Sequence, residues 1–158
     1  MNKKIVSNLR LKKILDRARS RKKIVFTNGC FDLVHVGHVT LLQKAKRLGD
    51  ILVLGLNSDA SLQRLKGPSR PLVDERSRAC VLAALACVDY VTIFPQDTPA
   101  QIIKLLRPHI LVKGGDYKLD AIVGREFVDK VVRLPLVSGH STSRLIEKIV
   151  KVYGKSAA

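Results

Sequence analysis

The sequence predicts a single α/β domain built on a Rossmann-like, doubly wound parallel sheet. Short apolar runs alternate with amphipathic segments along the chain, which is the pattern of strands joined by crossover helices. The runs are almost continuously apolar, as in strands that helices cover on both faces. The length of 158 residues suits one domain, and neither internal repeats nor a domain-scale linker interrupt it.

Each strand and helix has a local signal. The first helix should have Ser7 as its N-cap and should bury Leu9, Ile14 and Leu15. The predicted strands cover residues 24–28, 51–56, 90–94, 110–112 and 131–134. Five predicted helices begin near residues 8, 35, 74, 99 and 143 and end near residues 19, 48, 87, 106 and 152, respectively. A further helix begins near residue 59, and the sequence marks no end for it.

Polar residues and prolines mark where the later helices start. Asp74 and Glu75 place negative charge at the positive end of a helix dipole. Thr98 is expected as an N-cap, with Pro99 at the first helical position. Before these two helices, the segment from Lys66 to Pro71 contains two prolines and is predicted to be a loop.

By composition the chain divides into a basic N-terminal helix (1–22), a main domain (23–153) and a short tail (154–158). The net charge is +16, and residues 1–23 hold ten Lys or Arg and one Asp. Such an arm is typical of a nucleic-acid or membrane-surface site, or of the solvated face of a packed helix. Because only 4% of the residues are aromatic and none is Trp, a base-stacking platform is missing. We therefore expect a packed helix, with neither nucleic acid nor a membrane as partner.

The remaining composition favours a cytoplasmic protein. No apolar stretch approaches the length that crosses a bilayer, and the basic N-terminus lacks the apolar core of a signal peptide. The three cysteines cannot all pair within the chain, and Cys80 and Cys87 are expected in the core as reduced thiols. Cys30 lies in a turn before a helix, but no acidic group is evident to orient a His–Cys pair, so we do not expect a nucleophile.

The most informative segment is the decapeptide Gly29-Cys30-Phe31-Asp32-Leu33-Val34-His35-Val36-Gly37-His38. It follows a predicted strand and opens a helix, so backbone N–H groups and the helix dipole would face a phosphate. His35 and His38 are three residues apart and should share one helix face, and Gly37 leaves room for close approach. The alternative is a pair of surface histidines at a helix start. The position between strand and helix favours a nucleotide site.

Polar clusters elsewhere should meet this segment. They follow predicted strands or precede helices, and ligands of doubly wound sheets bind beyond the carboxyl ends of the strands. The clusters are Asn57-Ser58-Asp59, the loop 66–71, Lys113-Gly114-Gly115-Asp116 and Ser141-Thr142-Ser143.

These motifs resemble a known superfamily. Residues 27–32 and 35–38, with Gly139-His140-Ser141-Thr142-Ser143, resemble the cytidylyltransferase-like nucleotidyltransferases. Residues 53–59, 66–71 and 111–117 are similar to the heptose 1-phosphate adenylyltransferases within it. The resemblance spans about residues 23–149. It implies transfer of AMP from ATP to D-glycero-β-D-manno-heptose 1-phosphate, giving ADP-heptose and pyrophosphate for lipopolysaccharide core synthesis. Members are often fused to a sugar kinase, for which this chain has no room.

The resemblance also implies roles for individual residues. Catalysis falls to His35, His38 and Lys66. Nucleotide binding falls to Thr27, Asn28, Gly29, Cys30, Phe31, Gly37, Lys113, Gly114, Ser141, Thr142 and Ser143. Substrate binding falls to Asp32, Asn57, Asp59, Arg70 and Asp116. Mg²⁺ is expected with ATP, held mainly by phosphates and water, and no protein metal site is expected.

Several interpretations stay open at this stage. Ser141–Ser143 and Asn57–Asp59 are also ordinary helix caps, Lys66 could be a solvated loop lysine, and 113–116 a simple turn. Asp32 could orient a histidine, bind Mg²⁺ or contact the sugar phosphate. Leu136 stands where glycerol-3-phosphate cytidylyltransferases carry an Arg, which argues against that activity. Two other functions stay open for the chain. It could be a related nucleotidyltransferase that acts on another phosphorylated acceptor, or a basic nucleic-acid-binding module. The sequence is compatible with a homo-oligomer such as a dimer.

Overall fold

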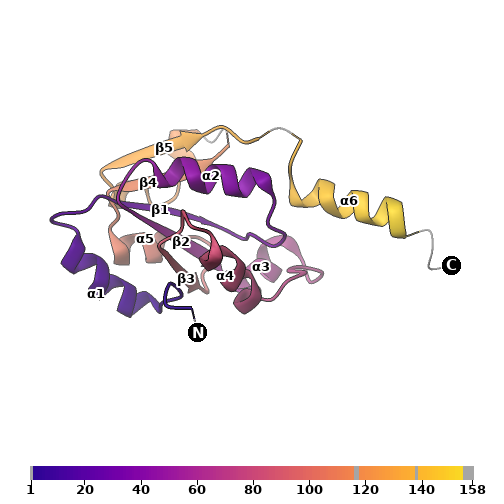
Figure 1. Ribbon diagram of the computed structural model, residues 1–158, viewed down its shortest axis with the longest axis horizontal. Coiled ribbons are helices and arrows are strands. Elements are labelled where there is room, and N and C mark those ends of the chain that lie inside the picture. The colour runs from indigo at the N-terminus through magenta and orange to yellow at the C-terminus, as the bar shows by residue number, and fades with distance from the viewer. Residues whose placement is uncertain (1, 116–117, 138, 155–158) are drawn as a thin grey trace.

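The computed structural model describes residues 2–115, 118–137 and 139–154, and it shows one five-stranded parallel sheet (Figure 1). The spatial order is β3-β2-β1-β4-β5. The strands are β1 (Ile24–Gly29), β2 (Ile51–Asn57), β3 (Tyr90–Phe94), β4 (Ile110–Gly114) and β5 (Lys130–Leu134). The direction of winding reverses between β1 and β4, which is the switch point where such sheets bind ligands. The predicted fold class is confirmed.

Helices cover both faces of the sheet. They are α1 (Asn8–Ala18), α2 (Val36–Lys46), α3 (Asp59–Lys66), α4 (Glu75–Ala84), α5 (Ala100–Leu106) and α6 (Thr142–Tyr153), with 3₁₀ turns at Leu119–Ala121 and Arg125–Phe127. One apolar core lies between the sheet and α2 and α4, and the other between the sheet and α1 and α5. Alternate residues of β1 point into the two cores, Val25 into the first and Phe26 into the second. α6 extends away from the sheet (Figure 1). No helix in the described ranges has the length and apolar character needed to span a bilayer.

The N-terminal segment is part of this fold. Ile5 pairs with Val91 beside β3, and α1 buries Leu11 and Leu15 completely. The expected burial of Leu9 is wrong, because it lies on the outer face and is 69% exposed. Ser7 occupies the N-cap position, but its side chain makes no capping hydrogen bond. The basic residues of α1 therefore surround a buried stripe formed by an i, i+4 pair.

Three further predictions, on α4 and α5, need correction. α4 ends at Ala84, where Leu85 adopts an extended backbone, and does not continue to residue 87. Cys80 is exposed, so its expected place in the core is wrong, and Cys87 is partly buried. Pro99 is itself the N-cap of α5 and not its first helical residue.

A buried arginine ties the carboxyl ends of β1 and β2 together. Arg78 on α4 is 1% exposed. Its guanidinium donates to the carbonyl of Cys30, to the carbonyl of Asn57 at 3.0 Å and to Oδ1 of Asp59 at 2.6 Å. Its Nε donates to the carbonyl of Val73 at 2.9 Å. One side chain thus joins α4 to three other segments, which follow β1, end β2 and precede α4.

We expect Arg78→Met to lower the free energy of unfolding by about 3 kcal/mol, because it leaves buried carbonyls and a carboxylate without their donor. Urea denaturation of the variant and of the wild type would measure the difference. Arg76→Met, at an exposed position of the same helix, is the matched control. A loss no larger than that of the control would contradict the assigned role of Arg78.

Candidate active site

A cavity of about 340 Å³ lies beyond the carboxyl end of β1. Four parts of the chain line it: the turn after β1, the first turn of α2, α3 with the following loop, and the N-terminus of α6. The lining residues are Cys30, Phe31, Asp32, His38, Leu62, Lys66, Arg70, Thr142 and Ser143. All of them except Leu62 are residues that the sequence assigned to a nucleotide or substrate site. Segments more than 100 residues apart in sequence therefore meet at the predicted place.

The two histidines form a stacked pair. The ring centroids of His35 and His38 are 3.8 Å apart, with an angle of 23° between the planes. Burial is the main cause that lowers the pKa of His38 to about 4, and the neighbouring His35 lowers it further. Burial also lowers the pKa of His35, with a smaller effect from His140. Both rings are therefore neutral at pH 7.

Both rings also carry a polar atom without a partner. Nδ1 of His35 and Nδ1 of His38 are buried and make no hydrogen bond within the described structure. Buried polar atoms are rarely left unsatisfied, so such a pair needs a specific reason, of which a functional role is one. This observation favours a binding site over a pair of surface histidines.

Glycines allow the close packing of this turn. A Cβ at Gly37 would lie 3.0 Å from Nδ1 of His35, so the missing side chain makes room for the His35 ring. A Cβ at Gly29 would lie 2.8 Å from the ring of Phe31. Phe31 itself has a φ of 45°, in the left-handed region, and packs at 4.9 Å from the ring of His38. Because Gly29 is still part of β1, the turn between β1 and α2 begins at Cys30.

A buried lysine lies at the end of the neighbouring strand. Lys113 on β4 donates to Oδ1 of Asn28 on β1 at 2.5 Å. Burial lowers the pKa of Lys113 to about 8. The structure thus brings Lys113 and Asn28 together at the switch point, next to the buried Thr27. Gly114 packs against Leu41 and Leu136 on the other face of the sheet. These residues do not line the cavity of 340 Å³ itself.

The N-terminus of α6 closes the cavity on one side. Ser141 caps the helix, since its Oγ accepts a hydrogen bond from the N–H of Arg144 at 3.2 Å. Thr142 contacts the carbonyl of Leu33 at 3.4 Å, and the side chains of Thr142 and Ser143 line the cavity. The positive end of the helix dipole is therefore directed at this space.

Asn57 and Asp59 make bonds within the protein instead of facing the cavity. Asn57 is 4% exposed and its amide donates to Oγ of Ser61 at 3.0 Å. Asp59 pairs with Arg78, and it exchanges hydrogen bonds with the backbone and side chain of Glu75. Asp116 lies outside the described residues. The role of Arg78 was missed, because an arginine in an amphipathic helix pattern gives no signal of burial.

Cys30 is not poised as a nucleophile. Burial raises the pKa of its thiol above the ordinary value, and this effect outweighs the opposing influence of Lys66 and Arg78. A protonated thiol is a weak nucleophile. The raised pKa does not favour a catalytic role for this thiol, and the absence of one stays a prediction.

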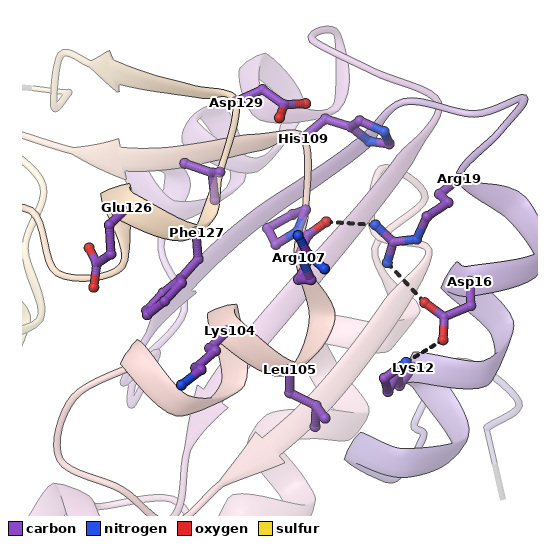
Figure 2. A pocket seen from close by; sticks show the side chains of 12 residues that line it. Lys12, Asp16, Arg19, Lys104, Leu105, Arg107, His109, Glu126, Phe127 and Asp129 are labelled. Atoms are coloured by element: carbon purple, nitrogen blue, oxygen red, sulfur yellow. Dashed lines mark hydrogen bonds and ion pairs between the residues drawn. The ribbon is translucent and has the colours of Figure 1, made fainter.

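A larger open hollow of about 950 Å³ lies between α1 and α5 near the start of β4 and β5 (Figure 2). None of the predicted site residues lines it. Three of its charged side chains form ion pairs with each other: Asp16 contacts Lys12 at 2.5 Å and Arg19 at 3.1 Å. Arg19 also donates to the carbonyl of Arg107 at 2.9 Å, as Figure 2 shows. The smaller cavity is therefore the candidate active site.

Comparisons with known proteins show which family the chain resembles. A model of the cytidylyltransferase-like family matches residues 26–153. The chain is 59% identical over 138 residues to the bifunctional protein HldE of Geobacter sulfurreducens, covering 85% of this chain and 28% of the relative. It is 56% identical over 142 residues to HldE of Helicobacter pylori, covering 89% and 31%. The chain thus spans less than a third of the length of these curated relatives.

Two solved structures share the architecture. A lipopolysaccharide core biosynthesis protein of Thermoplasma volcanium superposes with a TM-score of 0.64 at 28% identity, over 74% of this chain and 99% of that chain. A pantoate–β-alanine ligase of Francisella tularensis superposes with a TM-score of 0.61 at 18% identity, over 95% and 77%. The second likeness concerns the fold alone.

We expect the depressed pKa of His38 to make stability depend on pH. The folded state favours the neutral ring, so the contribution is fully present above the unfolded pKa of about 6.5 and is lost as the pH falls toward 4. Urea denaturation at pH 7 and pH 4.5 should show a smaller loss of stability in His38→Gln than in the wild type. His140→Gln, at an exposed histidine, is the control. Equal losses in all three proteins would show that His38 is not buried in its neutral form.

Proposed function

The chain belongs to the cytidylyltransferase-like family, and on that premise we propose that it transfers AMP from ATP to D-glycero-β-D-manno-heptose 1-phosphate. The products are ADP-heptose, used for lipopolysaccharide core synthesis, and pyrophosphate. The observation that carries the proposal is the single cavity in which His38, Lys66, Arg70 and the N-terminus of α6 meet. The similarity to HldE and to a lipopolysaccharide core biosynthesis protein supports the choice of acceptor.

The reaction needs little acid–base chemistry. A phosphate oxygen of the acceptor, already ionised at neutral pH, attacks the α-phosphorus of ATP. The bond from the α-phosphorus to the bridging oxygen breaks, and its electron pair leaves with pyrophosphate. Catalysis then consists of aligning the two phosphates and stabilising the charge that develops on them.

The cavity supplies donors for this task. His38 lines the cavity, and His35 stacks on it without lining the cavity itself. Both rings are neutral, so each carries one N–H that is suited to a phosphate oxygen. The backbone N–H groups at the start of α6, with Thr142 and Ser143, are suited to the β- and γ-phosphates. Lys66, at the exposed end of α3 beside Gly67, lines the same cavity and is suited to contact the α-phosphate, where the acceptor and the leaving pyrophosphate meet.

Mg²⁺ enters this scheme as part of the substrate MgATP. Asp32 is the one carboxylate among the described residues that line the cavity, and hydrogen bonds from the loop 67–73 already occupy its oxygens. The residues present therefore suit a cation that the triphosphate and water hold, and not one held by the protein. We propose a cytoplasmic location, where ATP is supplied; a homo-oligomer stays a prediction.

The direct test is to incubate the protein with each NTP and a panel of phosphorylated acceptors and to measure pyrophosphate. The panel includes heptose 1-phosphate, glycerol 3-phosphate, pantetheine phosphate and flavin mononucleotide. Release of pyrophosphate with ATP and heptose 1-phosphate alone would support the proposal. Turnover of a different acceptor would replace the substrate, and salt-sensitive binding of nucleic acid without turnover would favour the basic-module alternative.

We expect His35→Ala and His38→Ala each to lower kcat by about 100-fold or more, with a smaller change in the KM for ATP. Their hydrogen bonds should strengthen as charge moves onto the leaving pyrophosphate, so they stabilise the transition state more than the bound substrate. Steady-state pyrophosphate release measures both constants. Near-wild-type kcat in both variants would remove the histidines from the mechanism.

We expect ATP to exceed CTP by at least about tenfold in kcat/KM with heptose 1-phosphate as acceptor. Leu136 stands where glycerol-3-phosphate cytidylyltransferases carry an Arg, so a charged contact available to that branch is missing. Loss of one good polar contact costs about 1–3 kcal/mol. Equal use of both nucleotides, or a preference for CTP, would contradict the adenylyltransferase assignment.

A further inference from the structure

The loop 67–73 is anchored to the end of β1 through one buried carboxylate. Oδ2 of Asp32 accepts a hydrogen bond from Nη1 of Arg70 at 2.7 Å. Oδ1 accepts from the backbone N–H groups of Leu72 at 2.8 Å and of Val73 at 3.1 Å. Asp32 is 7% exposed. Both oxygens are thus engaged by the loop, which leads directly into the N-cap of α4 at Asp74.

This arrangement is unsuited to direct contact between Asp32 and a phosphate. A carboxylate accepts hydrogen bonds and donates none when ionised, and it repels another anion. Releasing a loop donor to bind a sugar hydroxyl would leave a buried N–H without a partner. Asp32 is therefore suited to hold the loop and not to bind the acceptor.

Arg70, unlike Asp32, is suited to bind an anion. Its side chain is 22% exposed and lines the cavity beside Lys66. Within the described chain its guanidinium donates to Asp32 alone, and that bond uses one of five N–H donors. The remaining donors have the fork geometry that matches a phosphate. The ion pair fixes the direction in which this fork points.

The topology places the loop 67–73 and the N-terminus of α6 on different sides of β1. β1 lies between β2, which leads into α3 and the loop, and β4–β5, which lead into α6. In an in-line displacement the attacking and leaving oxygens lie on opposite sides of the α-phosphorus. If the leaving pyrophosphate lies at the N-terminus of α6, the attacking phosphate approaches from the side of Arg70.

We infer that Arg70 binds the phosphate of the acceptor and that Asp32 is a positioning residue which holds Arg70 and the loop 67–73 for this contact. The inference rests on the proposed function, since it names the ligand of that same cavity. The sequence predicted that both residues bind the substrate. In this inference only Arg70 contacts the acceptor, and Asp32 acts by positioning Arg70.

Steady-state kinetics separates these roles. In Arg70→Ala we expect the KM for heptose 1-phosphate to rise at least about tenfold and the KM for ATP to change less than about threefold. Arg70→Lys keeps the charge but loses the fork, so its acceptor KM should be intermediate. Asp32→Asn should raise the acceptor KM in the same way, and Asp32→Asn/Arg70→Ala should resemble Arg70→Ala alone. Arg64→Ala, on the preceding helix α3, breaks only the exposed pair with Asp97 and should change neither KM.

A larger effect on the KM for ATP than for the acceptor, or strictly additive effects in the double variant, would overturn the inference. If another phosphorylated acceptor proves to be the substrate, the same comparison applies to its KM, although the proposed function has failed.

A binding measurement covers the case in which no acceptor is turned over. With saturating α,β-methylene ATP, inorganic phosphate should raise the Tm of the wild type and of Arg64→Ala but not of Arg70→Ala. Equal shifts in all three proteins, or none in the wild type, would overturn the assignment of Arg70.

Discussion

The guanidinium of Arg78 is the interaction on which the geometry of the site depends. It joins the carbonyls that end β1 and β2, the carboxylate of Asp59 and the carbonyl of Val73. Because the group is buried, each bond lies in a low-dielectric interior where loss of a donor is costly. The turn that carries the histidines, the start of α3 and the loop 67–73 all begin or end at one of these anchors.

The charged groups around the cavity favour the binding of an anion. Lys66, Arg70 and the positive end of α6 surround it, and Arg70 already neutralises Asp32. Burial keeps the histidine pair uncharged, so these rings offer hydrogen bonds without competing for the counter-charge of the phosphates. Donors held in place before the substrate arrives need little reorganisation during the reaction, which is the condition for efficient stabilisation of developing charge.

Periodic patterns predicted the architecture, because every strand of a covered parallel sheet must be apolar and every crossover helix amphipathic. The His35–His38 motif and the capping serine Ser141 were likewise visible, since their function depends on local spacing. Asp59 was harder to assign, because only the tertiary fold shows that it pairs with Arg78 from another helix. The exposure of Leu9 and Cys80 was missed for a related reason: both are apolar residues of helices, and packing alone decides which helix face is covered.

The central claim is that the cavity aligns an acceptor phosphate with the α-phosphorus of ATP. It is tested most directly by following the label from two forms of ATP in reactions with heptose 1-phosphate. The account predicts that α-³²P appears in the nucleotide sugar and γ-³²P in pyrophosphate. Transfer of γ-³²P to the sugar phosphate, or release of γ-³²P as inorganic phosphate alone, would contradict it.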